Sequence, residues 1–224
     1  MIHFFTRKMP YRPTPRTEAR RAATRERILS AALDQLADGG YASASIQAIA
    51  ARAGVATGSV YRHFPSKREL FAEAFRRAAA PELEVVRDLT AAGDRPAREL
   101  IAAAVEAFAR RALAEPTRAY ALLAEPVDPA VETERLVFRR GYRDAFVQAL
   151  EHGIDRGELP PHDTETVAAA LVGALGEALV GPLSPRMNGR RGRRPHEALV
   201  ATLVQFSLDA TPRDPALAES GVGA

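Results

Sequence analysis

The chain has 224 residues and no cysteine, with 46% hydrophobic and 26% charged residues. This is the composition of an ordinary globular protein, and the lack of cysteine excludes disulfides, thiolate metal ligands and a cysteine nucleophile. The net charge of +3 is uneven: residues 1–80 hold 14 Lys and Arg against 6 Asp and Glu, and the rest hold 17 against 22. A basic front half indicates either a polyanionic partner or a solvated basic face.

From the sequence we expect neither a signal peptide nor a membrane span. Ile2 to Phe5 is too short an apolar run for a signal peptide, and Glu177 stops the longest apolar run before it reaches the thickness of a bilayer. We therefore expect a cytoplasmic protein without a membrane segment. Residues 1–20 contain three prolines, and we expect a disordered basic arm there, with Met1 or Met9 as the start. The arm either follows a minor groove of DNA or stays idle.

Three helices are expected next. Thr24 precedes a helical pattern that places Ile28, Leu29 and Leu36 on one face, and Gly39-Gly40 ends it. Ser45 is the expected N-cap of a short helix over Ile46–Ala53. After a turn at Gly54-Val55, a second short helix covers Thr57–His63. Helices this short and closely spaced are typical of a helix-turn-helix module, which we assign to residues 21–68.

The remainder is helical as well. Ser66 and Glu69 have capping-box spacing at the start of the next helix. Few alternating runs occur, so the fold class is all-α: an N-terminal three-helix helix-turn-helix domain followed by a C-terminal helical bundle over residues 69–211 and a disordered tail at 212–224. The expected helices of the bundle cover residues 67–92, 96–114, 117–124, 129–157, 163–181 and 195–210.

The segment from Ser45 to Phe75 carries most information. Ala50 is small where two helices cross, and Gly54 permits a left-handed turn. The second short helix is too polar for a core element, and its donors suit base edges and phosphates. These exposed residues are Thr57, Gly58, Ser59, Tyr61, Arg62 and His63.

This segment resembles the TetR family, the tetracycline-repressor-like regulators. The resemblance covers about Thr24 to Phe75. The matching residues are Ile49-Ala50, Ala53-Gly54-Val55, Gly58-Ser59-Val60-Tyr61, His63-Phe64 and Ser66-Lys67 with Leu70.

The resemblance implies a role for each residue. Thr57, Gly58 and Ser59 are expected in the major groove of double-stranded DNA. Tyr61, His63, Lys67 and Ser45 are expected at phosphates, and Arg62 at either base or backbone. The alternatives are that Tyr61 packs against the first helix and that His63 is an ordinary surface histidine. Val60 and Phe64 are assigned to the core. Ala56 stands where many relatives have serine, so Thr57 is an alternative N-cap.

For the C-terminal half the resemblance implies a homodimer through the last two long helices, about 164–181 and 195–208, and a pocket for an unknown small-molecule effector. The first of these helices is apolar nearly all round, which agrees with burial either on a partner or in a monomeric core. Glu177 interrupts it, and this carboxylate is expected to face a ligand, pair across the dimer or lie at a solvated edge. The other candidate pocket residues, each also a candidate for plain core, are Phe108, Tyr120, Leu123, Phe138, Tyr142 and Phe146.

No feature of the sequence favours an enzyme. The five histidines show no metal-ligand spacing, and neither a nucleophile elbow nor a phosphate loop is present. We therefore expect no catalytic residues, no metal and no cofactor. The expected function is a ligand-responsive repressor on a palindromic operator, and the remaining rival is a helical interaction protein that never touches DNA.

Overall fold

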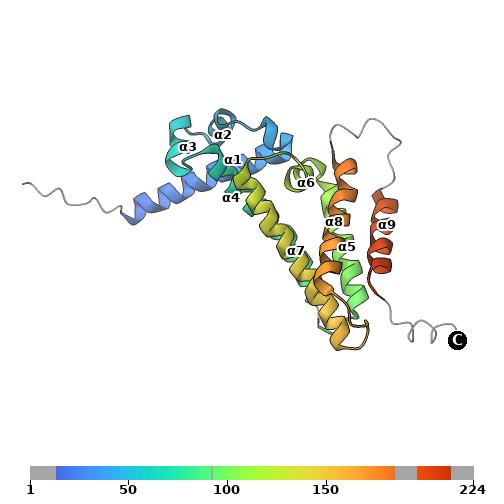
Figure 1. Ribbon diagram of the computed structural model, residues 1–224. Helices are drawn as coiled ribbons and strands as arrows, with labels where there is room; N and C mark the ends of the chain where they lie inside the picture. The colour runs from blue at the N-terminus through green and yellow to red at the C-terminus, as the bar shows by residue number, and fades with distance from the viewer. Residues whose placement is uncertain (1–13, 92, 185–195, 213–224) are drawn as a thin grey trace, which may run out of the picture.

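The computed structural model describes residues 14–91, 93–184 and 196–212, and within these ranges it contains helices and no strand. The all-α fold is thereby confirmed. The helices, coloured in chain order in Figure 1, are α1 (Pro15–Ser43), α2 (Ile46–Ala53), α3 (Thr57–His63), α4 (Lys67–Thr90), α5 (Ala97–Ala114), α6 (Pro116–Leu123), α7 (Pro129–Asp155), α8 (Thr164–Leu183) and α9 (His196–Ala210).

Two hydrophobic cores lie along the molecule. The first joins α1, α2, α3 and the start of α4 around Ile28, Ile49 and Phe71, none of which is more than 1% exposed. The second joins α5, α7, α8 and α9 with the end of α4. We call the first group the head and the second, together with α6, the body. Figure 1 shows α1 projecting from the head, whereas α5, α8 and α9 stand side by side in the body.

Helix α1 begins ten residues earlier than expected. Thr14 is its N-cap, accepting the N–H of Thr17 at 3.3 Å, and Pro15 occupies the first helical position. The expectation of a disordered arm is therefore wrong for residues 15–20, and Thr24 lies inside the helix rather than at its start. The apolar periodicity begins only at Ile28, because the first three turns are exposed or half-buried. The rest of the expected arm, residues 1–13, and positions 213–224 of the expected tail lie outside the described residues.

The end of α1 is shaped by Gly40, whose φ of 74° breaks the helical backbone before a last turn to Ser43. This left-handed conformation strains any residue with a Cβ. A Cβ on Gly40 would also lie 2.6 Å from a carboxylate oxygen of Glu125. The glycine therefore lets the connection between α6 and α7 dock against the end of α1.

The two short helices have the bounds expected from sequence. Ser45 accepts the N–H of Ala48 at 3.1 Å, which caps α2, and Gly54 ends it with φ 63° and ψ 43°. Ala56 takes the N-cap position of α3 but makes no side-chain cap hydrogen bond. Val60 is fully buried and Phe64 is 3% exposed, so both core assignments are confirmed. The opposite face of α3 is left to solvent.

Helix α4 belongs to both cores. Ser66 caps its start by accepting the N–H of Glu69 at 3.2 Å, as the spacing predicts. Leu70 and Phe71 are buried in the head, and Val86 is buried in the body. The helix continues through Pro81 without interruption. The helix therefore connects the two cores directly.

Candidate nucleic-acid interface and ligand pocket

Helix α3 presents one polar face to solvent. Thr57, Gly58 and Arg62 are exposed, Tyr61 is 47% exposed, and Ser59 and His63 are half-buried. Tyr61 thus does not pack into the head core. Arg62 donates to the hydroxyl of Ser59 at 3.1 Å, one turn earlier on the same face. All six predicted α3 residues are therefore at least partly accessible, and only Val60 of α3 is buried.

Ser45 and Lys67, the other two predicted DNA-binding residues, lie outside α3 and make other contacts. The Ser45 hydroxyl is engaged as the cap of α2. The Lys67 ammonium lies 4.8 Å from the ring centroid of Tyr41 and 5.5 Å from that of Phe71. These are cation–π distances, so Lys67 is held at the start of α4 rather than ranging through solvent.

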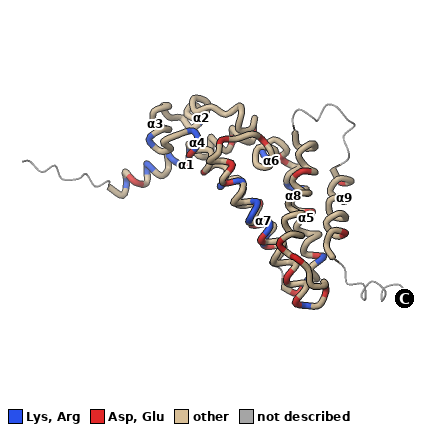
Figure 2. The backbone as a smooth tube through the Cα atoms, viewed as in Figure 1, with Lys and Arg blue, Asp and Glu red and all other residues tan. Residues whose placement is uncertain are grey.

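A groove runs between α3 and the extended start of α1, and the sequence did not predict it. Among the described residues, Arg16, Arg20, Arg21 and Arg27 make no ion pair. Other arginines of the head are neutralised, since Arg25 pairs with Glu73 and Arg52 with Asp38. Figure 2 shows basic residues recurring along α1 toward α3. The residues that line the groove are Thr17, Arg20, Arg21, Thr24, Arg27, Val55, Ala56, Ser59, Arg62 and His63.

His63 lies in the electropositive part of this groove. Partial burial, followed by the nearby charges of Arg21, Arg62 and Arg25, lowers the pKa of its imidazole below the ordinary value. The same charges that disfavour a protonated histidine attract an anion. The groove therefore has the electrostatics of a phosphate-binding surface.

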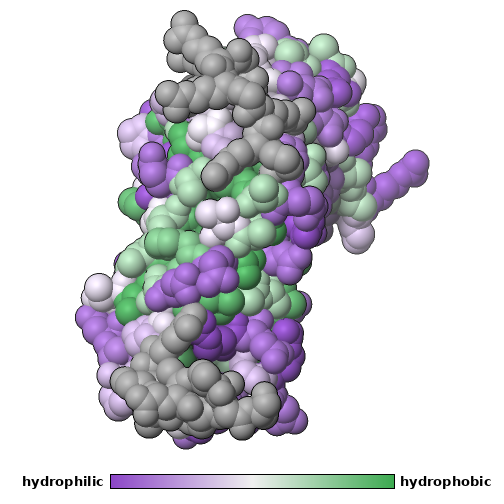
Figure 3. Space-filling view, turned by 90° about the vertical axis from the view of Figure 1, so that its right-hand side faces the viewer, coloured by the Kyte–Doolittle hydropathy of each residue, from purple (hydrophilic) through white to green (hydrophobic). Residues whose placement is uncertain are grey.

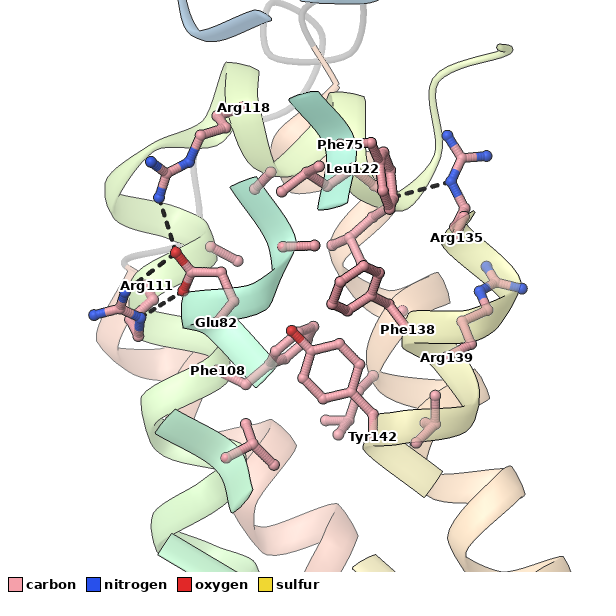
Figure 4. A pocket seen from close by; sticks show the side chains of 18 of the residues that line it. Phe75, Glu82, Phe108, Arg111, Arg118, Leu122, Arg135, Phe138, Arg139 and Tyr142 are labelled. Atoms are coloured by element: carbon pink, nitrogen blue, oxygen red, sulfur yellow. Dashed lines mark hydrogen bonds and ion pairs between the residues drawn. The ribbon is translucent and has the colours of Figure 1, made fainter. Parts of the chain in front are cut away.

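The body contains a cavity between α4, α5, α6, α7 and α8, with a volume of about 80 Å³. Five of the seven predicted pocket residues line it: Phe108, Leu123, Phe138, Tyr142 and Phe146. The rings of Phe108 and Tyr142 meet edge to face at 5.3 Å. Figure 4 shows Phe138 and Tyr142 reaching into the cavity from α7 and Phe108 from α5.

The other two predicted pocket residues lie elsewhere. Glu177 is exposed on α8, because the face of that helix buried in the chain carries Leu171, Leu175 and Leu179. Gly176, its neighbour, lines the cavity instead. Tyr120 packs against the body core without reaching the cavity. Tyr120 thus lies against the core and Glu177 at an exposed edge, and these positions agree with the alternatives given for the two residues.

Sequence reasoning missed the contribution of α4 and of charged residues to the cavity wall. Phe75, Glu82 and Val86 line it from α4. Arg111 donates to Glu82 at 2.5 and 3.1 Å, and Arg118 donates to it at 2.9 Å. The sequence of a single helix does not reveal such ion pairs, because the pairs form only where the faces of three helices meet.

One face of α8 and α9 is apolar and open. Viewed from the side of α9, hydrophobic residues gather over these two helices (Figure 3). Ala169, Ala170 and Gly173 are exposed on α8, and Phe206 is 47% exposed on α9. Within the described ranges, α8 is the one helix long and apolar enough to cross a membrane by length and composition, with 28% of its apolar window buried. A helix that pairs with another chain passes the same test.

The described residues hold no cluster of three or more His, Cys, Asp or Glu arranged for a metal ion. The charged side chains of the cavity wall include ion pairs rather than an open set of ligands. We assign no catalytic step to this arrangement.

The head presents an exposed polar helix directly after a tight turn, and it is joined to a helical body with an internal cavity. These two features define the class of helix-turn-helix regulatory proteins. A family model described as "Bacterial regulatory proteins, tetR family" matches residues 28–74. The match covers α2, α3 and parts of α1 and α4, so the head is similar to the members of this family.

Several curated relatives are named as repressors. KstR of Rhodococcus jostii is 47% identical over 53 residues, which cover 24% of this chain and 25% of that protein, so the match spans about a quarter of this relative's length. BepR of Brucella suis is 29% identical over 188 residues, covering 79% of this chain and 87% of the relative.

Solved structures share the whole fold. FadR from Bacillus subtilis, in complex with stearoyl-CoA, superposes with a TM-score of 0.68 at 20% identity, covering 83% of this chain and 98% of that one. FadR from Bacillus halodurans has the same TM-score and identity, covering 88% and 97%. At this identity the likeness concerns the fold.

Proposed function

We propose that the protein is a transcriptional repressor that binds a palindromic operator as a homodimer and is released by a small-molecule effector. The observation that carries this proposal is the polar face of α3, exposed beside a groove of unpaired arginines. Such a surface has no role in the packing of the head. A regulator of chromosomal DNA would work in the cytoplasm.

The DNA-facing surface has two parts in this proposal. Thr57, Gly58 and Ser59 enter the major groove at the start of α3, and Arg62 contacts a base or a phosphate. Tyr61, His63, Lys67 and Ser45 hold the backbone on either side. The basic residues of α1 extend the contact to phosphates beyond those reached by α3, since unpaired guanidinium groups bind phosphate well.

The homodimer in this proposal forms through the apolar face of α8 and α9. A twofold axis there would bring the two copies of Phe206 and of the small residues of α8 into one interface. The relatives KstR and BepR are named as repressors, which supports the direction of regulation. Two heads on a twofold axis read half-sites about 34 Å apart, which predicts a palindrome.

Two connections link the cavity to the head. Phe75 of α4 lines the cavity and is 3% exposed in the head core, where its ring lies 5.9 Å from that of Phe138. Leu122, at the end of α6, also lines the cavity, and three residues later Glu125 binds the end of α1. An effector that shifts α4 or α6 would thus change the spacing of the two heads and lower operator affinity.

Footprinting on the promoter region upstream of the protein's own gene tests the proposal. At low ionic strength we expect a protected palindrome, with affinity that falls steeply as salt rises because phosphate contacts release counterions. The variant Tyr61→Ala should lose the footprint while keeping its melting temperature, because Tyr61 is exposed. A helical interaction protein that never touches DNA would give no footprint under any condition, and that result would overturn the proposal.

A further inference from the structure

The residues that line the cavity restrict the charge, size and polarity of a ligand that can bind there. We infer that the cavity takes a compact, uncharged, mainly apolar molecule, of one or two rings, that offers a hydrogen-bond acceptor to the hydroxyl of Tyr142. This inference rests on the proposed function, which makes the cavity the effector site. It adds the charge, size and polarity of the effector.

The greater part of the lining is aromatic and aliphatic. Phe75, Phe108, Phe138 and Phe146 surround the cavity from α4, α5 and α7, and Val172 and Leu175 close it from α8. Rings are well suited to such a lining, because edge-to-face contacts with aromatic side chains are favourable. Burial of apolar ligand surface is therefore the main source of affinity.

The charged groups on one side of the cavity are already paired. Glu82 is 16% exposed at its side chain and accepts from both Arg111 and Arg118. Arg118 also pairs with Glu115 at 3.1 Å. Figure 4 shows Glu82 of α4 with Arg111 of α5 and Arg118 of α6 on this side of the cavity. An anionic ligand would have to displace Glu82 or lie beside its like charge, which is costly at a site with little water.

The charged groups on the other side are turned away. Arg135 is 7% exposed and donates to the carbonyl of Leu122 at 2.9 Å and that of Glu125 at 2.7 Å. Arg139 points away from the cavity in Figure 4. No unpaired charge of the lining therefore faces the interior. A charged ligand would stay uncompensated, whereas a neutral one would not.

Tyr142 supplies the polar contact. Its hydroxyl points into the cavity in Figure 4, and it makes no hydrogen bond with the described residues. Burial raises the pKa of the phenol well above its ordinary value, so the group stays protonated and can donate. Phe108 holds the ring in place by the edge-to-face contact. A ligand carbonyl or ether oxygen would satisfy this donor.

The cavity volume limits the size of the ligand. The observed volume of about 80 Å³ is smaller than the cavity of roughly 150 Å³ that holds a benzene molecule in an engineered protein core. Even a single ring must therefore push the wall outward. Because Phe75 and Leu122 belong to that wall, entry of the ligand moves the two connections to the head.

Calorimetry on the full-length protein tests the inference with sets of three ring compounds that share a skeleton. One such set is 1-indanone, indane and indane-1-carboxylate, and further sets are built on naphthalene and cyclohexane. In at least one set the neutral ketone should bind about five- to tenfold more tightly than the hydrocarbon, as expected for one hydrogen bond. The carboxylate of that set should bind at least about a hundredfold more weakly than the ketone.

Variants then locate the contact. Tyr142→Phe should remove the preference for the ketone over the hydrocarbon, whereas Tyr120→Phe, outside the cavity, should preserve it. The inference is overturned if carboxylates bind as tightly as ketones, if no neutral compound binds, or if Tyr142→Phe leaves the preference unchanged. Operator binding of the ligand-free protein is measured separately. If the protein binds its operator but prefers anionic compounds, this inference is overturned and the proposed function still stands.

Discussion

The carboxylate of Glu125 accepts the backbone N–H of Tyr41 at 2.7 Å, across 84 positions of the chain. It also accepts the N–H of Ala42 at 3.0 Å, and Glu125 is 8% exposed. The phenol of Tyr41 in turn bonds to Asp128. Because Gly40 breaks the helical backbone, these two N–H groups begin a separate last turn of α1, and the connection between α6 and α7 supplies their acceptor. Head and body are joined there by specific polar contacts in addition to α4.

This contact predicts a loss of stability on substitution. Glu125→Ala should lower the free energy of unfolding by about 2–3 kcal/mol, because two partly buried N–H groups lose a charged acceptor. Urea denaturation at neutral pH measures the change. Glu115→Ala is the matched control, since its side chain is 53% exposed, and it should change stability by less than about 1 kcal/mol. Equal effects of the two substitutions would contradict the role of Glu125 as a structural link.

The basic start of α1 predicts a salt-dependent contribution to DNA affinity. Arg20→Ala with Arg27→Ala should weaken operator binding about tenfold and reduce the slope of log affinity against log salt by about 2, since each lost phosphate contact removes roughly 0.9. Fluorescence anisotropy between low and physiological salt measures both values. Arg95→Ala, which removes a surface ion pair with Glu99 in the body, should leave the slope unchanged. An unaltered slope in the double variant would show that α1 does not touch the backbone.

The sequence predicts those parts of the DNA-facing surface that are determined by neighbouring residues in the chain. The bounds of α2 and α3 follow from Ser45, Gly54 and the residues around them, because caps and left-handed turns are local. The start of α1 was missed because exposed turns leave no apolar period. The groove between α1 and α3 is consequently a structural finding.

For the cavity, the sequence predicted the aromatic lining but not the charged residues of the wall. Phe108, Phe138 and Tyr142 were found because large aromatic side chains in a helical body have few other places to lie. Glu82 and Arg118 were not found, because their pairing depends on the meeting of α4 and α6. The sequence left three alternatives open for Glu177, because a helix that is apolar all round does not reveal which face its own chain covers.

The lowered pKa of His63 predicts a pH dependence of operator binding. In the free protein, burial and neighbouring arginines favour the neutral imidazole. A DNA phosphate at His63 would favour the protonated form, so the complex takes up a proton. Affinity should therefore rise as the pH falls through and below the ordinary histidine value of about 6.5. Anisotropy titrations between pH 8 and pH 5.5 measure the effect, on the order of a few-fold.

The variant His63→Gln isolates this effect from other titrating groups. It should flatten the difference in affinity between the two ends of the pH range. The free protein should show the reverse trend in stability: because the folded pKa is depressed, the unfolded chain binds the proton more readily, and stability falls as the pH drops below about 6.5. An identical pH profile for the wild type and His63→Gln would mean that no phosphate lies at this residue.

The apolar face of α8 and α9 predicts that one charge is enough to separate the two subunits. Ala170 is exposed in the single chain and lies in the middle of α8. On a twofold interface, Ala170→Arg would introduce two like charges into a desolvated surface, one from each copy. We expect sedimentation velocity to show a monomer, and operator affinity to fall by about a hundredfold or more because the two heads no longer bind as one unit. Ala80→Arg, at an exposed alanine of α4, should remain dimeric. If Ala170→Arg sediments like the wild type, the subunits meet through another surface, and the predicted spacing of the two heads on the operator would have to be derived anew from that surface.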